Sequence, residues 1–458
     1  MSVVAMGTFI ITLDAGAIRI ALPYLGHVFN TDPNTVIWVW LIYLLVGIGL
    51  MLTMGRAGDA FGRKRLYTFG LIIFSLGLGL CSLSQGLIQL VVFRFFQAVG
   101  GAMVIATGNA IIITSFPSEE RGRALGIMGA VIAVGLLSGP ALGGFLLDFL
   151  GWRSIFYLRL PFGIIGVAMS WALLKEQSLP KREGKFDLLG AITLFFALTC
   201  LLLAVNRGQS LGWLSLWVVS LSVIGVVLLF FFLSVERRAA QPILDLRLFS
   251  SRLFSTASAS HVFLYISTTA VSFLMPFYLI QGLGFYAYKA GLVLVTIPAI
   301  SLVLSPLSGR LSDKLGTLFL CTSGLIVVCA GLFLLSSLGT NASIGDIVLY
   351  LAIIGAGMGL FISPNTSAIM GSVPSERLGT ASAVVGTLRQ VGMSVGLAIA
   401  GSVFAASQFF HATQLASQAL PEDVVQRLST VNGFHDTVLA VLAMAIIGLV
   451  TSVLRGRR

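Results

Sequence analysis

The sequence predicts an all-α polytopic membrane protein with fourteen transmembrane helices, and three observations support this fold class. Hydrophobic residues make up 57% of the 458 positions and charged residues only 10%, whereas about a quarter of the residues in a soluble domain are charged. Apolar runs of about twenty residues, long enough to span a bilayer as helices, recur along the whole chain. The third observation is an internal repeat of short motifs. A chain of this kind satisfies its backbone hydrogen bonds within helices.

The apolar runs predict six helices in the first part of the chain, two in the middle and six in the last part. The first six lie at 4–27, 34–54, 66–84, 87–113, 120–147 and 153–174. Each of these boundaries is placed to within about two to four residues. The middle pair lies at 186–206 and 212–234, and the last six lie at 254–281, 287–308, 317–338, 345–368, 377–408 and 434–454. We therefore divide the chain into an N-terminal six-helix bundle (1–174), linker loops with an inserted helix pair (175–252) and a C-terminal six-helix bundle (253–458).

The two outer bundles share short sequence segments, which indicates an internal duplication. The matching segments are Gly55–Gly62 with Gly309–Gly316, Pro117–Gly122 with Pro374–Gly379, and Asn109 with Asn365. Each match is separated by the length of eight predicted helices rather than six, so the inserted pair stands between two equivalent halves. Parallel repeats of this kind build membrane transporters whose binding site lies near the midplane between the halves.

Basic residues gather at alternate ends of the predicted helices, and these clusters orient the chain. They are Arg63–Arg65, Lys181–Lys185, Arg237–Arg238 and Arg455–Arg458. Because Lys and Arg are enriched in cytoplasmic loops, we expect these loops and both termini in the cytoplasm and the chain in the cytoplasmic (inner) membrane. The net charge of +11 then reflects orientation and contact with anionic lipid rather than nucleic-acid binding.

Among the 17 acidic residues, only Asp14 falls in the middle of a predicted helix. An ionisable side chain there costs about 2.5–3.5 kcal/mol on insertion scales and needs a functional reason. Burial raises the pKa of a carboxyl group and a neighbouring arginine lowers it, so such a site can titrate near neutral pH. We interpret Asp14 as a proton-coupling carboxylate. The alternative is a structural ion pair with a neighbouring arginine.

Arg19, Arg94 and Arg389 also fall inside predicted helices, and Arg159 lies about two turns into another. Arg19 and Asp14 are offset by about 140° around their helix, so they need not pair with each other. The excess of positive charge favours an anionic or weakly acidic substrate, because a guanidinium matches a carboxylate or a phosphate. In the alternative interpretation these arginines bond backbone carbonyls and hold helices together.

Polar side chains within the predicted helices are candidates to line a substrate cavity. They are Tyr43, Gln97, Asn109, Asn365 and Gln390, and we group Arg19 and Arg389 with them as substrate-binding residues. His261 is either a hydrogen-bonded interior histidine or a proton relay.

The predicted helix at 120–147 carries a series of small residues and one proline, Gly135, Gly139, Pro140, Gly143 and Gly144. Small residues let helices approach closely, and proline frees a backbone carbonyl and bends the helix. This segment serves as a hinge or as a static packing surface, and the two roles are compatible.

No motif points to catalysis or to nucleotide use. The chain lacks a phosphate-binding Gly-x4-Gly-Lys-Ser/Thr segment, and neither a metal-ligand cluster nor a nucleophile–base pair can be assembled from its soluble regions. The four cysteines lie in apolar runs, as small packing residues do. We expect a protein that is not an enzyme and has no metal or cofactor, with a proton gradient as its energy source.

The motifs resemble those of the major facilitator superfamily over nearly the whole chain. Gly55–Arg65 is similar to the family's loop between helices 2 and 3, and this resemblance implies a cytoplasmic charge latch that includes Asp59 and Arg63. Gly135–Gly144 is similar to helix 5 of the antiporter branch. Arg94–Gly100 is similar to the helix 4 segment whose arginine is linked to proton transfer.

With fourteen predicted helices, the chain most resembles the fourteen-helix drug:proton antiporter family. Leu13-Asp14 with Ala21–Pro23 is similar to its helix 1 motif, Gly151–Arg153 to the start of its helix 6, and Arg389-Gln390 to its helix 13.

Three residues depart from that family's pattern. Arg19 and Arg159 stand where the family usually has asparagine, and Gly16 replaces a usual threonine. The added positive charge favours neutral, zwitterionic or acidic amphiphiles over cationic drugs as substrates.

The resemblance implies a proton-coupled exporter of amphiphilic drugs or related small molecules that works by alternating access. Arg94 would tune Asp14, and Arg19 and Arg389 would face the substrate. One alternative is an exporter or flippase of an anionic lipid or an organic-acid metabolite. Another, of a different class, is a transport-inactive membrane scaffold or receptor. The expected partners are a small amphiphilic substrate, protons and membrane lipids, and we expect a monomer.

Overall fold

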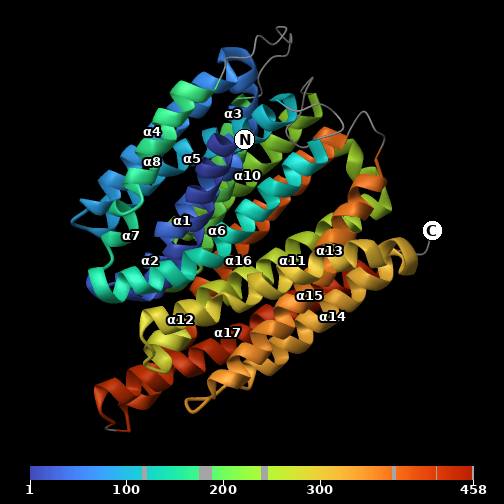
Figure 1. Ribbon diagram of the computed structural model, residues 1–458. Coiled ribbons are helices and arrows are strands. Elements are labelled where there is room, and N and C mark those ends of the chain that lie inside the picture. Colours follow the sequence, from blue (N-terminus) through green and yellow to red (C-terminus); the bar gives the residue numbers. More distant parts are fainter. Residues whose placement is uncertain (116–120, 175–187, 239–245, 374–377, 419, 456–458) are drawn as a thin grey trace. The chain divides into compact units, whose positions relative to one another are not determined.

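The computed structural model describes residues 1–115, 121–174, 188–238, 246–373, 378–418 and 420–455. These residues form helices and their connections, without strands (Figure 1). In this part of the chain, 13 helical segments are long and apolar enough to cross a membrane, and a shorter apolar segment lies at Ile192–Gly208. Together they match the fourteen predicted crossings, so the predicted all-α membrane fold is confirmed.

The observed helices follow the predicted order. The first six crossings are α1 (Ser2–Val28), α2 (Pro33–Val36) with α3 (Trp38–Phe61), α4 (Arg63–Ser82), α5 (Leu87–Ser115), α6 (Arg121–Leu150), and α7 (Ser154–Tyr157) with α8 (Leu160–Leu173). The inserted pair is α9 (Leu188–Leu211) and α10 (Leu216–Arg238), followed by the 3-10 turn η1 (Leu246–Ser250). The last six are α11 (Arg252–Phe277) with the π turn η2 (Tyr278–Gly282), α12 (Ala287–Leu294) with α13 (Thr296–Leu315), α14 (Thr317–Ser336), α15 (Ile344–Gly371), α16 (Leu378–Ala416) and α17 (Glu422–Val453).

Helices α16 and α17 are longer than the sequence predicts, with 39 and 32 residues. At 1.5 Å per residue they are about 58 and 48 Å long, which exceeds the roughly 30 Å hydrocarbon core of a bilayer. Asp436 consequently lies in the interior of α17, so the expectation that only Asp14 occupies a helix interior is wrong. Nε2 of His411 on α16 lies 2.8 Å from Oδ2 of Asp436, which ties the two long helices together.

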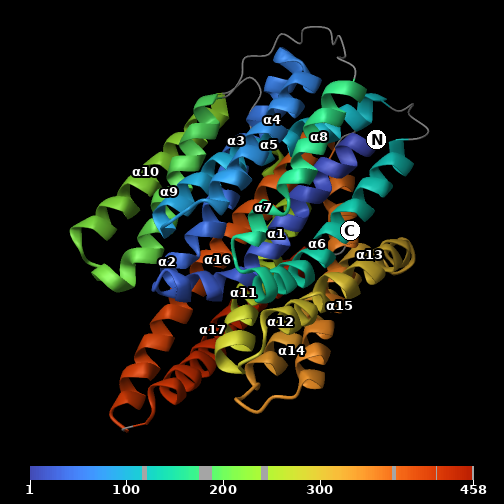
Figure 2. The ribbon, with the colours of Figure 1, turned by 60° about the vertical axis from the view of Figure 1, so that its left-hand side comes forward.

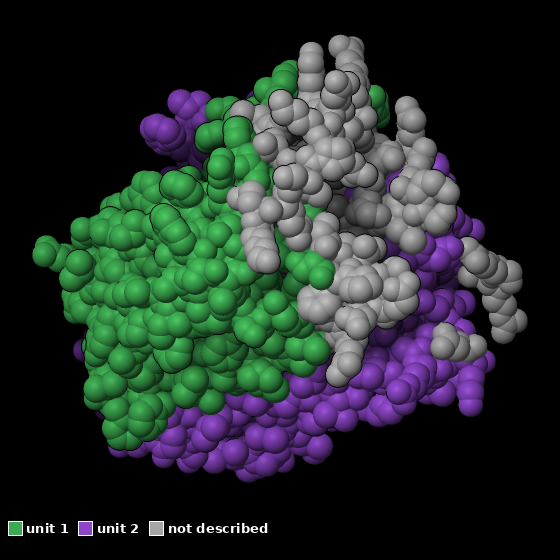
Figure 3. Space-filling model, turned by 45° about the horizontal axis from the view of Figure 1, so that its top comes forward, with its two compact units in different colours: residues 1–31, 38–200, 224–243 green, residues 32–37, 201–223, 244–458 purple. Residues whose placement is uncertain are grey.

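The described chain forms two compact units, coloured separately in Figure 3. Unit 1 consists of residues 1–31, 38–200 and 224–243, and unit 2 of residues 32–37, 201–223 and 244–458. Helix α9 therefore begins in unit 1 and ends in unit 2, and the short helix α2 belongs to unit 2. The division at residues 174 and 252 stays a prediction.

The same packing pattern occurs within each unit, as the internal repeat predicts. In unit 1, α1 packs on α6, and α5 packs between α3 and α4 (Figure 1 and Figure 2). In unit 2, α11 packs on α16, and α15 packs between α13 and α14. The described repeats, Gly55–Gly62 with Gly309–Gly316 and Asn109 with Asn365, therefore belong to helices with equivalent neighbours.

The last position of the repeat formed by Gly55–Gly62 and Gly309–Gly316 is glycine for a conformational reason. Gly62 separates α3 from α4 with a φ of 101°, and Gly316 separates α13 from α14 with a φ of 82°. Glycine adopts a positive φ at no steric cost, whereas other residues do so rarely. Both copies of the motif thus end at a sharp turn between two helices.

The glycine face of α6 packs directly on α1 around Asp14. A Cβ atom at Gly135 would lie 2.9 Å from Cβ of Thr12, and one at Gly143 would lie 2.8 Å from Cα of Ala17. Between them, a Cβ at Gly139 would lie 2.7 Å from Cα of Gly16. The predicted small-residue surface is therefore a close helix contact, and it presses the Asp14 turn of α1 against α6.

Gly139→Ala is expected to destabilise the contact between α1 and α6. The added Cβ would lie 2.7 Å from Cα of Gly16 and 2.8 Å from the carbonyl oxygen of Leu13, and overpacking of this kind costs about 1–3 kcal/mol. Gly129→Ala in the same helix is the matched control, because its Cβ would meet nothing within 4 Å. The melting temperature of the purified protein should fall for the first variant only. Equal melting of the two variants would contradict the packing argument.

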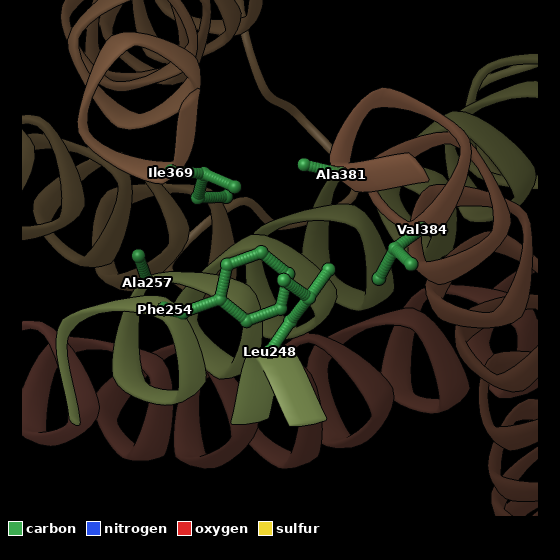
Figure 4. Packing of buried hydrophobic residues seen from close by; sticks show 6 residues of the cluster. All are labelled: Leu248, Phe254, Ala257, Ile369, Ala381 and Val384. Carbon is green, nitrogen blue, oxygen red and sulfur yellow. The ribbon is translucent and has the colours of Figure 1, made fainter. Parts of the chain in front are cut away.

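A small apolar cluster holds the end of unit 2 at which α11 begins. It contains Leu248, Phe254, Ala257, Ile369, Ala381 and Val384 (Figure 4). These residues come from η1, α11, α15 and α16, so the turn that follows the inserted pair is packed onto the last bundle. Burial of this apolar surface fixes the start of α11.

A buried polar cluster in unit 2 joins α2 to the inserted helix α9. Nδ2 of Asn206 donates to the carbonyl oxygen of Asn34 at 2.8 Å, and the two side-chain amides also bond to each other. The hydroxyl of Ser402 on α16 donates to the carbonyl oxygen of Val205 at 3.3 Å. Asn206 is fully buried and Asn34 nearly so. The end of α9 is thus fastened to both α2 and α16.

Asn206→Ala is expected to lower the stability of the protein. It removes the amide that bonds Asn34, and a buried polar group left without its partner costs about 1–3 kcal/mol. Thr199→Ala on the same helix is the control, because Thr199 bonds only the carbonyl of Phe195 one turn earlier. Thermal unfolding followed by tryptophan fluorescence compares the two variants. An unchanged midpoint for Asn206→Ala would show that the cluster does not fasten α9.

Candidate functional site

Asp14 lies inside unit 1 and is engaged by two arginines from different helices. Its carboxylate is fully buried. Nη1 of Arg94 on α5 lies 2.7 Å from Oδ2, and Nη1 of Arg159, at the junction of α7 and α8, lies 2.6 Å from Oδ1. Nε2 of Gln97 donates to Oδ1 at 3.3 Å. Three helical segments therefore meet at one carboxylate.

Arg94 is held in place by several partners besides Asp14. Its Nε donates to the carbonyl oxygen of Val39 at 3.1 Å, and Nη1 also donates to Oε1 of Gln97 at 2.7 Å. The guanidinium carbon lies 4.7 Å from the centroid of the Tyr43 ring, an arrangement that favours a cation. Arg94, which the resemblance assigns to tune Asp14, therefore contacts Asp14, with Gln97 and Tyr43 as immediate neighbours. Its tuning role stays a prediction.

Arg159 joins this cluster from a position that the sequence placed two turns into a helix. The structure instead breaks the predicted helix there: α7 ends at Tyr157, α8 begins at Leu160, and Arg159 is the residue that precedes α8. Its Nε donates to the carbonyl oxygen of Ile155. Both Arg94 and Arg159 retain one buried Nη2 without a hydrogen-bond partner among the described residues.

The charges of the cluster do not balance when Asp14 is ionised. One carboxylate faces two guanidinium groups, and a protonated Asp14 would leave both groups without a counter-ion. A buried charge that loses its partner is strongly destabilising, typically by about 3–5 kcal/mol. The protonation state of Asp14 therefore controls how tightly α1, α5 and the start of α8 are held together.

Arg19 stands apart from the Asp14 cluster. It makes no ion pair with Asp14, and its guanidinium carbon lies 4.8 Å from the centroid of the Trp40 ring. Its Nε has no hydrogen-bond partner in the described chain. The sequence-based expectation that Arg19 and Asp14 need not pair agrees with this placement.

The candidates of unit 2 fall into a buried group and an accessible group. Asn365 is fully buried, its Nδ2 lies 3.4 Å from Nδ1 of His261, and its Oδ1 accepts a hydrogen bond from Arg455. Arg389 is exposed and Gln390 is half-buried on α16. The substrate-binding roles assigned to these residues stay predictions.

Arg455 is a residue whose position the sequence analysis missed. The sequence places it in a cytoplasmic basic cluster, whereas its side chain is 5% exposed and Nη2 donates to Oγ of Ser260 at 2.8 Å. Its chemical type carries no signal of this burial, because a basic residue just after a membrane helix normally faces the cytoplasm.

Two of the predicted gate residues, Gly55 and Asp59, lie on α3, and the predicted substrate-binding residue Asn109 lies on α5, but their surroundings fall outside what the structure describes. Arg63 is half-buried and its Nη1 donates to the carbonyl oxygen of Ala110 at 3.1 Å, which links the start of α4 to α5. Gly144 is buried beside Gly143 on α6. The gating roles of these residues stay predictions.

Comparison with known families decides the class of this protein. Residues 4–397 match the family described as the Major Facilitator Superfamily. The chain belongs to this superfamily. It is therefore a multi-pass membrane transporter and not an enzyme, as the sequence predicts.

Several curated relatives are named as transporters or multidrug resistance proteins. The riboflavin transporter RibZ of Clostridioides difficile (strain 630) is 35% identical over 411 residues, covering 89% of this chain and 88% of the relative. The multidrug resistance protein Stp of Mycobacterium tuberculosis (strain CDC 1551 / Oshkosh) is 31% identical over 423 residues, covering 92% and 78%. Multidrug resistance protein 3 of Bacillus subtilis (strain 168) is 32% identical over 368 residues, covering 80% and 72%.

Solved structures agree with the superfamily fold. A bacterial homolog to the human lysosomal transporter Spinster, in an inward-facing and unoccupied conformation, aligns with a TM-score of 0.73 and 16% identity. The alignment covers 99% of this chain and 95% of that one. At this identity the likeness establishes the fold of the facilitator and no more.

Proposed function

We propose that this facilitator is a proton-coupled exporter of amphiphilic small molecules that works by alternating access, with Asp14 as its proton-binding group. The observation that carries the proposal is the buried carboxylate between Arg94 and Arg159. An ionisable residue inside a membrane helix bundle is costly and is kept for a functional reason, often in a proton pathway.

Coupling follows from the three elements that meet at Asp14. When the carboxylate is ionised, it holds α5 and the start of α8 to α1 through the two arginines. Protonation removes that attraction, so the protonated and ionised states favour different packings of these helices. An antiporter needs only that the proton favours one conformation and the substrate the other. Arg94 and Arg159 would then be the residues that transmit the proton's effect.

The relatives bear on the substrate class. They include a riboflavin transporter, multidrug resistance proteins and a probable actinorhodin transporter of Streptomyces coelicolor. Such names support a small organic substrate for this chain too, of the amphiphilic kind that the sequence predicts.

The remaining expectations belong to the same proposal. The basic clusters support a cytoplasmic (inner) membrane location with both termini in the cytoplasm. The proton gradient would supply the energy without a metal or a cofactor. The transporter would act as a monomer among membrane lipids, without a nucleic-acid partner.

Transport by reconstituted protein tests this function. The full chain is placed in liposomes, a pH gradient is imposed, and accumulation of a fluorescent amphiphile is followed with and without a protonophore. The proposal predicts accumulation that the protonophore collapses. If no solute moves under any gradient, the chain is the transport-inactive scaffold or receptor that the sequence leaves as an alternative.

A further inference from the structure

Arg19 has no neutralising partner among the described residues of unit 1. Its guanidinium lies over the ring of Trp40, a residue that is 1% exposed. No ion pair or hydrogen bond of Arg19 with a described residue is present, and its Nε is closed off from the surroundings. Nη1 and Nη2 are not closed off in this way, and the side chain as a whole is only half-buried. One edge of the guanidinium therefore remains available to a ligand.

The two arginines that contact Asp14 show which bonds an arginine makes when it holds helices together. Arg94 and Arg159 each pair with Asp14, and each donates Nε to a backbone carbonyl. Arg19 has neither kind of bond. It nevertheless lies about 26 Å along α1 from Ser2 and about 13 Å from Val28. A charge at such a depth is expensive, and fastening helices together does not account for it.

Unit 2 presents a comparable group of its own. Arg389 on α16 is exposed, and its guanidinium has no hydrogen-bond or ion-pair partner within the described ranges. Arg19 in unit 1 and Arg389 in unit 2 are therefore both accessible arginines inside membrane-crossing helices. Asp14 in unit 1 already forms ion pairs with two other arginines, Arg94 and Arg159. An added anion would complement this excess of positive charge.

We propose that the transported molecule is an aromatic or amphiphilic acid and that its carboxylate binds the Nη1/Nη2 edge of Arg19. This inference rests on the proposed transport function and specifies its substrate class. A guanidinium offers two parallel N–H donors that match the two oxygens of a carboxylate. Trp40 covers one face of the guanidinium and fixes its plane, so the donors are preorganised for binding.

Matched sets of ligands test the charge preference directly. Each set contains three compounds that share one aromatic ring system and carry a carboxylate, a carboxamide or an amine. One set is naphthylacetate, naphthylacetamide and naphthylethylamine, and further sets use larger rings. Binding to the purified full-length protein is screened by thermal stabilisation and measured by calorimetry. Wild type should bind the acid about tenfold more tightly than the amide, because a charge-assisted hydrogen bond is lost in the amide.

Substitutions assign that preference to one residue. Arg19→Gln should bring the acid-to-amide ratio to about one, whereas Arg19→Lys should retain part of it because the charge remains. Arg153→Gln is the matched control, since Arg153 also stacks on a tryptophan, Trp152, at 4.4 Å, and bonds the carbonyl of Ser84. It should keep the wild-type ratio.

Several outcomes would overturn the inference. They are equal or tighter binding of amides or amines by wild type, an acid preference that survives in Arg19→Gln, and the absence of binding by every set. Stabilisation by short-chain phosphatidylglycerol without any by a carboxylate would assign Arg19 to a lipid headgroup instead. Acids that bind through Arg19 but move no protons would defeat only the proposed proton coupling. Proton-driven export restricted to amines would defeat only the substrate class.

Discussion

Asp14→Asn is expected to abolish transport driven by a proton gradient. Asparagine keeps the size of the side chain but cannot exchange a proton, so the gradient has no site at which to act. In proteoliposomes under an imposed pH gradient, solute accumulation by this variant should equal that of empty liposomes. Binding of the solute itself should persist, because Arg19 lies over Trp40 and makes no ion pair with Asp14.

The same substitution weakens the fold, and the controls separate this effect from coupling. Arg94 and Arg159 lose their shared counter-ion, which costs about 3–5 kcal/mol. The double variant Asp14→Asn, Arg159→Gln removes one uncompensated charge and should regain stability without regaining coupling. Asp436→Asn makes the same chemical change in unit 2, where Asp436 contacts His411, and should leave gradient-driven transport intact. Full accumulation by Asp14→Asn would refute the assignment of the proton site.

Arg94→Gln is expected to destabilise the protein strongly and to remove gradient-driven transport. Arg94 bonds Asp14 at 2.7 Å, Gln97 at 2.7 Å and the carbonyl of Val39 at 3.1 Å. Removing one partner of a buried ion pair costs about 3–5 kcal/mol. Arg94→Lys keeps the charge but has a single donor group on a flexible stem, so it should restore part of the stability and little of the transport.

Arg427→Gln is the matched control for this experiment. Arg427 donates to the carbonyl oxygens of Gly282 and Thr340 at 2.8 and 2.9 Å, and no carboxylate contact of its side chain is present among the described residues. Its loss should cost stability without affecting coupling. If Arg94→Gln and Arg427→Gln lower transport equally, Arg94 only stabilises the packing of the helices and does not take part in coupling.

The parts of the fold that hydropathy and repeats encode could be predicted. The fourteen crossings, the duplicated bundles and the glycine face at Gly135–Gly143 all leave a local sequence pattern. The partner of that face could not be predicted, because the pattern shows that another helix approaches closely but does not identify α1. The extensions of α16 and α17 were also missed, since helix that projects beyond a bilayer loses the apolar signal used to find it.

The candidate site was predictable as a set of residue types and not as a geometry. Asp14 and Arg94 stand out because charges are rare inside apolar helices. Their signs alone did not identify the pair, because Arg19 carries the same charge and makes no ion pair with Asp14. The contact of Arg159 with Asp14 joins residues far apart in the sequence and depends on the break between α7 and α8. Arg455 gave no signal at all, because its burial depends on Ser260 and Asn365 in other helices.

The most direct test of the account is the proton flux that a substrate gradient drives. Purified protein in liposomes is given a gradient of an aromatic acid without any pH gradient, and internal pH is followed with a trapped dye. The account predicts that protons move opposite to the substrate in wild type and do not move in Asp14→Asn. Substrate movement without proton movement in wild type, or an unchanged proton flux in Asp14→Asn, would contradict it.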